Sequence, residues 1–62
     1  MQVCYEVEPI KTGFQVICKI STPKGFGIGH IVFKTNTLEK ANSWAFDASK
    51  VLGCSVELYN VP

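Results

Sequence analysis

Apolar and polar side chains alternate along three separate stretches in the first half of the chain. Residues 2–8, 14–20 and 28–34 each follow a period of two, which is typical of strands with one buried face. The segments 9–13 and 21–25 separate these stretches, and both contain the proline and glycine that interrupt a strand. The short first connection predicts an antiparallel hairpin.

The alternation also assigns each side chain to one face of the expected sheet. The inward positions are Val3, Tyr5, Val7, Phe14, Val16, Cys18, Ile20, Ile31 and Phe33. The outward positions include Ile17, Lys19, His30, Val32 and Lys34. Each strand is therefore expected to bury one face and leave the other in solvent.

The period changes after residue 36. Five apolar positions form one helical stripe over residues 37–52: Leu38, Ala41, Ala45, Ala48 and Leu52. Asn36 or Thr37 can cap the start of this helix, and Glu39 completes a capping box with Asn36. Gly53 suits the left-handed residue that ends a helix. We expect Leu38, Ala45 and Leu52 to be buried against the sheet.

Residues 54–59 alternate once more and predict a final strand. Cys54, Val56 and Leu58 are expected to face inward and Tyr59 outward. The element order is then β-β-β-α-β, an α+β fold. One domain spanning residues 1–62 holds a single four-stranded sheet with one helix packed on one face, because this arrangement buries both apolar surfaces. The last strand runs parallel to the first and third strands, and the sequence leaves open beside which of them it pairs.

Composition narrows the class of function. Hydrophobic residues make up 47% of the 62 residues and charged residues 18%, which is typical of a globular protein. Six lysines against five acidic residues give a net charge of +1, which argues against a dedicated nucleic-acid-binding protein. We expect no membrane span and no signal peptide, because no apolar run has the required length and the first residues lack a basic segment.

The titratable residues do not form a recognisable reactive site. Cys4, Cys18 and Cys54 are odd in number and include no C-x-x-C pair, which predicts reduced thiols in a cytoplasmic protein and no zinc site. His30 is the single histidine, and the acidic residues are scattered. We expect no metal, no cofactor and no enzymatic activity, with an enzyme or redox protein that uses a cysteine as the remaining alternative.

The segment KGFGIGHIVF at 24–33 resembles the RNP-type motif of cold-shock and RNA-recognition domains. Lys24, Gly25, Phe26 and Gly27 match that motif, and Ile28 stands where its second aromatic residue would be. The resemblance implies stacking of Phe26 on bases, with Lys24 and His30 beside it, and single-stranded nucleic-acid binding is our alternative function. The competing interpretation is a glycine-rich hairpin with Phe26 at one end of the core.

Three strands followed by a helix also resemble the double-stranded-RNA-binding domain. That family grips phosphates with a lysine cluster at the start of its last helix. Here residues 36–40 provide one lysine and one glutamate, and the family's first helix has no counterpart.

Apolar side chains at outward positions predict a contact surface for a protein. Ile17, Val32 and Tyr59 are expected on the outer face, with Lys19 and Lys34 at its rim. Phe46 lies off the helical stripe and marks the helix as the competing surface. The partner is a protein of unknown identity, or a second copy of the chain in a homodimer.

The second half of the chain resembles small phage-encoded proteins that disable host machinery, such as the polymerase inhibitor of T7-like phages and several anti-CRISPR proteins. The resemblance rests on the strand at 28–34, the helix start TLEKA at 37–41 and the last strand SVELY at 55–59. It implies a non-catalytic protein that binds and inhibits one host protein.

Overall fold

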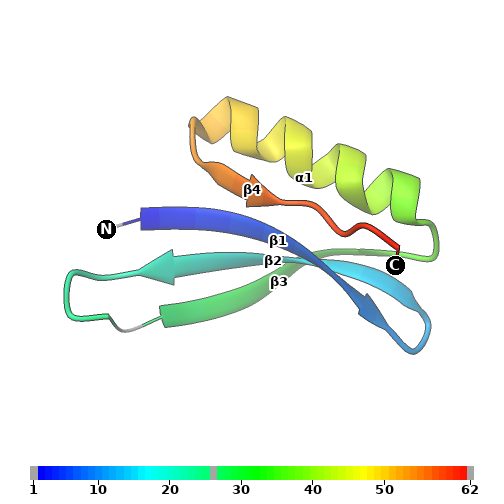
Figure 1. Cartoon of the computed structure of the whole chain (residues 1–62), viewed down its shortest axis with the longest axis horizontal. Helices are drawn as coiled ribbons and strands as arrows, with labels where there is room; N and C mark the ends of the chain where they lie inside the picture. Colours follow the sequence, from blue (N-terminus) through cyan, green and yellow to red (C-terminus); the bar gives the residue numbers. More distant parts are fainter. Residues whose placement is uncertain (1, 26, 62) are drawn as a thin grey trace.

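Four strands and one helix follow one another in the order that the alternation predicts. The computed structural model describes residues 2–25 and 27–61, so the candidate stacking residue Phe26 lies outside the described residues. The elements are β1 (Gln2–Ile10), β2 (Gly13–Ser21), β3 (Gly27–Thr35), α1 (Leu38–Leu52) and β4 (Ser55–Glu57). They form one four-stranded sheet with α1 on one of its faces (Figure 1).

The strand order in the sheet is β3-β2-β1-β4. β1 pairs antiparallel with β2, and β2 pairs antiparallel with β3. β4 lies parallel to β1, which answers the question that the sequence left open. The long strand β3 and the short strand β4 are therefore the two edges of the sheet.

Two glycines shape the turns between the antiparallel strands. The Gly25 N–H donates to the Thr22 carbonyl at 2.9 Å, and Gly25 has a φ of 79°, which glycine adopts without strain. Gly13 has a φ of 145°, and a Cβ there would lie 2.4 Å from the carbonyl oxygen of Thr35. The β1–β2 turn therefore approaches the end of β3 too closely for any side chain at residue 13.

The helix begins and ends close to the predicted residues. Thr37 is the N-cap and has an extended backbone, although its side chain makes no capping hydrogen bond. The expected capping box with Glu39 is therefore absent at this cap. Gly53 ends the helix in the left-handed conformation, and the Cys54 N–H donates to the Ser49 carbonyl at 3.0 Å.

The core lies between α1 and the sheet face that it covers. Its buried apolar members are Tyr5, Val7, Val16, Ala41 and Ala45. Leu38 is half-buried beside them. The prediction for Leu52 is wrong, because its side chain is 61% exposed. Leu52 shares the angular stripe of Ala45, but the buried and core-packed positions of α1 end at Ala48 and Ser49, and Leu52 lies beyond them in the last turn.

A β-bulge between β2 and β3 corrects the predicted faces of β3. Val16 is opposite Phe33, whereas Ile17 is opposite Ile31, so Val32 is an extra residue without its own partner. Because opposite residues share a face, Ile31 lies on the outer face with Ile17, and His30 lies on the helix side with Cys18. The prediction that Ile31 and Phe33 share the inner face, with His30 outside, is therefore wrong.

The last strand is shorter than its alternation suggested. β4 ends at Glu57, and the following residues are held by the helix rather than by β1. Leu58 is 41% exposed, whereas Tyr59 is half-buried against the core. The predicted directions of Leu58 and Tyr59 are therefore reversed.

Candidate functional site

An apolar patch lies on the sheet face that α1 leaves uncovered. Ile17 of β2 is opposite Ile31 of β3, and Ile31 is 55% exposed. Val32 follows in the chain and is also exposed. We call Ile17, Ile31 and Val32 the outer patch. The absence of a side chain at Gly29 leaves room for the Ile17 side chain, because a Cβ at residue 29 would lie 3.2 Å from Cγ2 of Ile17.

Charged side chains surround the outer patch. Lys19 forms an ion pair with Glu6 across β1 and β2, and Lys34 pairs in register with Gln15 on the same face. The hydrogen bond and the charge of Glu6 raise the pKa of Lys19, and the charge of Glu57 adds to this effect. The Gln15 side-chain amide donates to Glu8 farther along β1. The patch therefore has a polar rim that carries both signs of charge.

The structure brings together part of the predicted contact surface. Ile17, Lys19 and Lys34 share the outer face, with Val32 at the bulge beside them. Tyr59 does not belong to this surface, because its ring packs 5.9 Å from the ring of Phe14 on the helix side. Ile31 takes its place, and the sequence contained no signal for it because the bulge reverses its direction.

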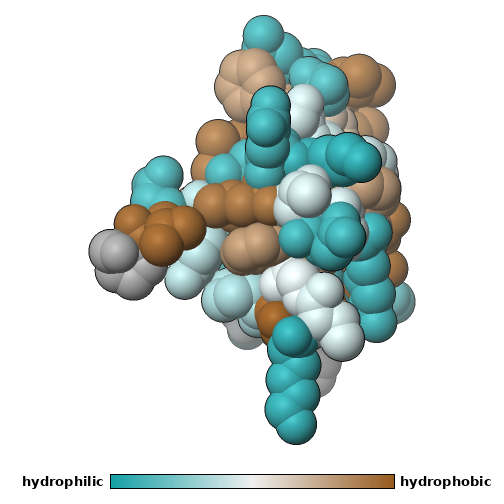
Figure 2. All heavy atoms as spheres, turned by 90° about the vertical axis from the view of Figure 1, so that its right-hand side faces the viewer, coloured by the Kyte–Doolittle hydropathy of each residue, from teal (hydrophilic) through white to brown (hydrophobic). Residues whose placement is uncertain are grey.

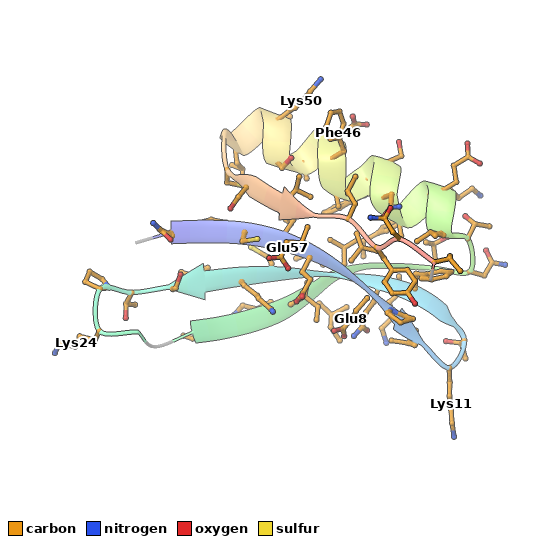
Figure 3. The ribbon with its side chains drawn as sticks, viewed as in Figure 1. Glu8, Lys11, Lys24, Phe46, Lys50 and Glu57 are labelled. Carbon is orange, nitrogen blue, oxygen red and sulfur yellow. The ribbon has the colours of Figure 1, made fainter. Side chains whose placement is uncertain are left out.

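Phe46 belongs to a different surface. It points away from the sheet on the solvent side of α1, together with Lys50 (Figure 3). The Lys50 Nζ lies 4.5 Å from the centre of the Phe46 ring, a cation–π contact. Phe46 therefore already has an intramolecular partner for its ring, whereas the outer patch presents aliphatic side chains.

The candidate nucleic-acid residues do not share one described surface. Lys24 lies in the β2–β3 turn at one end of the molecule (Figure 3). His30 lies on the helix side of β3 and is exposed. Phe26 lies outside the described residues, so the stacking platform remains a prediction.

The three thiols are distributed over both faces of the sheet. Cys18 lies opposite Tyr5 on the core side, and burial, followed by the charges of Cys18 and Cys54, raises the pKa of Tyr5. The Cys4 thiol donates to the Tyr5 carbonyl at 3.5 Å. Within residues 2–25 and 27–61, no group of three His, Cys, Asp or Glu side chains could hold a metal ion. Over the same residues, no helix is long and apolar enough to cross a membrane.

A groove separates α1 from the free edge of the sheet. Trp44 stacks on Phe33 of β3 with ring centres 5.2 Å apart and planes 6° from parallel, and its other neighbour is Tyr5 in an edge-on contact. The residues along this α1–β3 groove include Phe33, Glu39, Lys40, Ser43, Trp44 and Asp47. It is an open aromatic surface bordered by charged side chains.

Other exposed apolar residues are spread over the molecule. At the end that holds the β1–β2 turn, the start of α1 and the C-terminus, apolar side chains lie in small groups among polar ones (Figure 2). Val51 and Leu52 are exposed at the opposite end of α1. The outer patch differs from these residues because it joins two paired strands.

No family model, curated protein or solved structure matches this chain. The fold and the exposed surfaces define an α+β domain with one sheet face covered by a helix and the other open to contacts.

Proposed function

We propose that this chain is a non-catalytic binding protein that engages a partner protein and inhibits or otherwise modulates it. The observation that carries the proposal is the pair of Ile17 and the 55% exposed Ile31 on the uncovered sheet face. Burial of this apolar surface contributes about 25 cal/mol per Å², before the costs of association. A polar rim around an apolar centre is the usual arrangement of a protein contact.

The charged rim is expected to orient the partner protein and to contribute little to the binding affinity. Lys19 and Glu6 already neutralise each other, so Lys34 is the rim cation that the partner can pair with. Exposed charges of this kind mainly change the association rate and its dependence on salt. The apolar centre of the patch therefore provides most of the binding free energy.

Affinity capture tests this proposal. The protein and its Ile31→Lys variant are immobilised and exposed to lysate of the source cells, with and without nuclease. We expect the wild type to retain a protein that survives nuclease and that the Ile31→Lys variant does not bind, because the lysine places a charge in the centre of the patch. Val51→Lys is the matched control, since Val51 is 86% exposed and lies at the far end of α1.

Three results contradict the proposal. Release of the captured protein by nuclease supports the nucleic-acid function instead. Loss of capture in Phe46→Ala, together with full capture by Ile31→Lys, assigns the contact to the solvent side of α1. A wild-type dimer that Ile31→Lys converts to a monomer, with no other protein captured, makes the patch a self-interface.

A further inference from the structure

β3 has a free edge beside the α1–β3 groove. It is a nine-residue edge strand, and no other strand in the described part of the chain pairs with the side that faces away from β2. Between Gly27 and Ile31 it carries no proline, lysine or acidic residue, which commonly block an edge, and the bulge at Val32 lies beyond this stretch. An extended segment can therefore add to β3 through backbone hydrogen bonds.

The β-bulge limits which kind of segment can pair with the free edge of β3. The alternation of inner and outer residues changes at Val32. Two copies of β3 in an antiparallel two-fold pair therefore match faces only on one side of the bulge, for example over Gly27–Ile31. Self-pairing of β3 is therefore limited to one side of the bulge, whereas a segment with a different sequence does not have to match this break.

The groove provides contacts for the side chains of an added segment. Phe33 and Trp44 offer their exposed apolar surface between β3 and α1. Glu39, Ser43 and Asp47 are spaced four residues apart, so they form one ridge along the helix. Two carboxylates against the single ammonium of Lys40 give this wall an excess of negative charge.

The spacing of the two carboxylates matches an extended chain. Asp47 follows Glu39 by eight positions in the helix, which corresponds to about 12 Å along the axis. Four residues of an extended strand span about 13 Å, and residues i, i+2 and i+4 point to the same side. A segment with basic residues at i and i+4 and an apolar residue at i+2 thus places both charges at the carboxylates and the apolar side chain between them.

We propose that the α1–β3 groove binds an extended, basic-apolar-basic segment of a partner protein, which adds as a strand to the free edge of β3. This inference rests on the proposed function, because it takes the partner to be a protein. The binding surface is the α1–β3 groove on the helix side of the sheet, and not the outer patch. The two surfaces are therefore tested by different variants.

Synthetic peptides test the groove directly. The probe is a heptapeptide with blocked ends, Thr-Lys-Thr-Val-Thr-Lys-Thr, and its charge-reversed form carries glutamate in place of both lysines. Trp44 is the single tryptophan, so its fluorescence reports binding in the groove. We expect saturable binding of the lysine peptide and affinity lower by about two- to fivefold for each carboxylate contact removed.

Variants of the protein locate the contact. Asp47→Lys is expected to weaken the lysine peptide and to favour the glutamate peptide, whereas the charge-matched Glu57→Lys on the other sheet face leaves both affinities unchanged. N-methylation of the central valine and its two neighbours is expected to abolish binding, because it removes backbone donors from the added strand. Amide chemical shifts are expected to change along Gly27–Thr35 and the facing side of α1.

Several outcomes overturn the inference: no saturable binding at millimolar peptide, equal affinity for both peptides, an unchanged preference in Asp47→Lys, or full affinity after N-methylation. A dimer of the protein detected by sedimentation and located at β3 by concentration-dependent amide chemical shifts also overturns it. Ile17→Lys, which alters the outer patch from β2 rather than from the edge strand, is expected to bind the peptide normally while losing the captured partner. A negative peptide-binding result would therefore not affect the capture result for the outer patch. A negative capture result would likewise not affect the peptide-binding result.

Discussion

Asn42 holds Tyr59 through both polar atoms of its side-chain amide. Its Nδ2 donates to the Tyr59 carbonyl at 3.1 Å, and the Tyr59 N–H donates to its Oδ1 at 3.2 Å. Asn42 lies in α1, and Tyr59 lies two residues beyond the end of β4. A helix side chain thus takes the place of a neighbouring strand and directs the Tyr59 ring toward Phe14.

Asn42→Ala is expected to release the segment after β4. The change removes two hydrogen bonds in a half-buried environment, and we expect the free energy of unfolding to fall by about 1–3 kcal/mol. Denaturant unfolding measures this loss, and hydrogen exchange at the Tyr59 amide locates it. Asn36→Ala is the control, because Asn36 is exposed before the helix. Unchanged protection of the Tyr59 amide in Asn42→Ala would refute the role of this contact.

Ala45→Leu is expected to overpack the contact between α1 and the sheet. Ala45 has no exposed surface, so the additional side-chain atoms have no space and we expect a loss of about 1–3 kcal/mol. Leu52→Ala on the same stripe is expected to change stability by less than about 0.5 kcal/mol, because Leu52 is mostly exposed. Thermal unfolding compares the two variants, and the reverse order of stability contradicts the position of the helix.

Gly13→Ala is expected to destabilise the β1–β2 turn. The backbone at residue 13 has a positive φ, and the new Cβ would meet the Thr35 carbonyl oxygen at 2.4 Å. We expect a loss of more than about 1 kcal/mol in denaturant unfolding. Gly27→Ala is the matched control, since its Cβ would have its nearest contact, the Ile20 carbonyl oxygen, at 4.0 Å. Equal stabilities of the two variants would be inconsistent with this turn geometry.

Alkaline pH is expected to unfold the protein partly through Tyr5. Burial raises the pKa of Tyr5 above its ordinary value of 10.0, so the folded state holds this proton more tightly than the unfolded state does. The corresponding stabilisation is present below about pH 10 and is lost as pH rises through the folded pKa.

The Tyr5→Phe variant isolates this contribution. We expect the midpoint of denaturant unfolding to fall less steeply with pH above about pH 10 in the variant than in the wild type. Lys19, whose pKa is also raised, is present in both proteins and cancels in the comparison. Identical slopes would show that the Tyr5 hydroxyl does not titrate differently in the two states.

Local patterns predicted most of the fold. The alternation along residues 2–8 and 14–20 identified β1 and β2 with the correct faces, because each strand has one buried side. The alanines at 41 and 45 placed α1 on the sheet, and Gly53 marked its end. These features depend only on neighbouring residues, which a sequence contains directly.

The candidate site was predicted only in part, because it depends on relations between distant segments. Ile17 and Lys19 were placed correctly on the outer face. Ile31 was missed, since a bulge arises from the pairing of β2 with β3 and leaves no mark in the alternation of β3 itself. Tyr59 was misplaced because Asn42, seventeen residues earlier in the chain, determines its direction.

The bulge at Val32 shifts the alternation of inner and outer side chains along β3 by one residue. Residues before and after it follow the same two-residue period but in opposite phase. Loss of Val32 would remove the bulge and restore a single phase with the same pairs, so Ile31 would stay on the outer face and His30 on the helix side. Loss of one residue between Gly27 and Ile31 would instead turn the residues before it over to the opposite face. An exchange of side chains leaves this phase unchanged. Insertions and deletions in β3 are therefore the genetic changes that can reverse which face meets a partner, even where the composition of the strand is preserved.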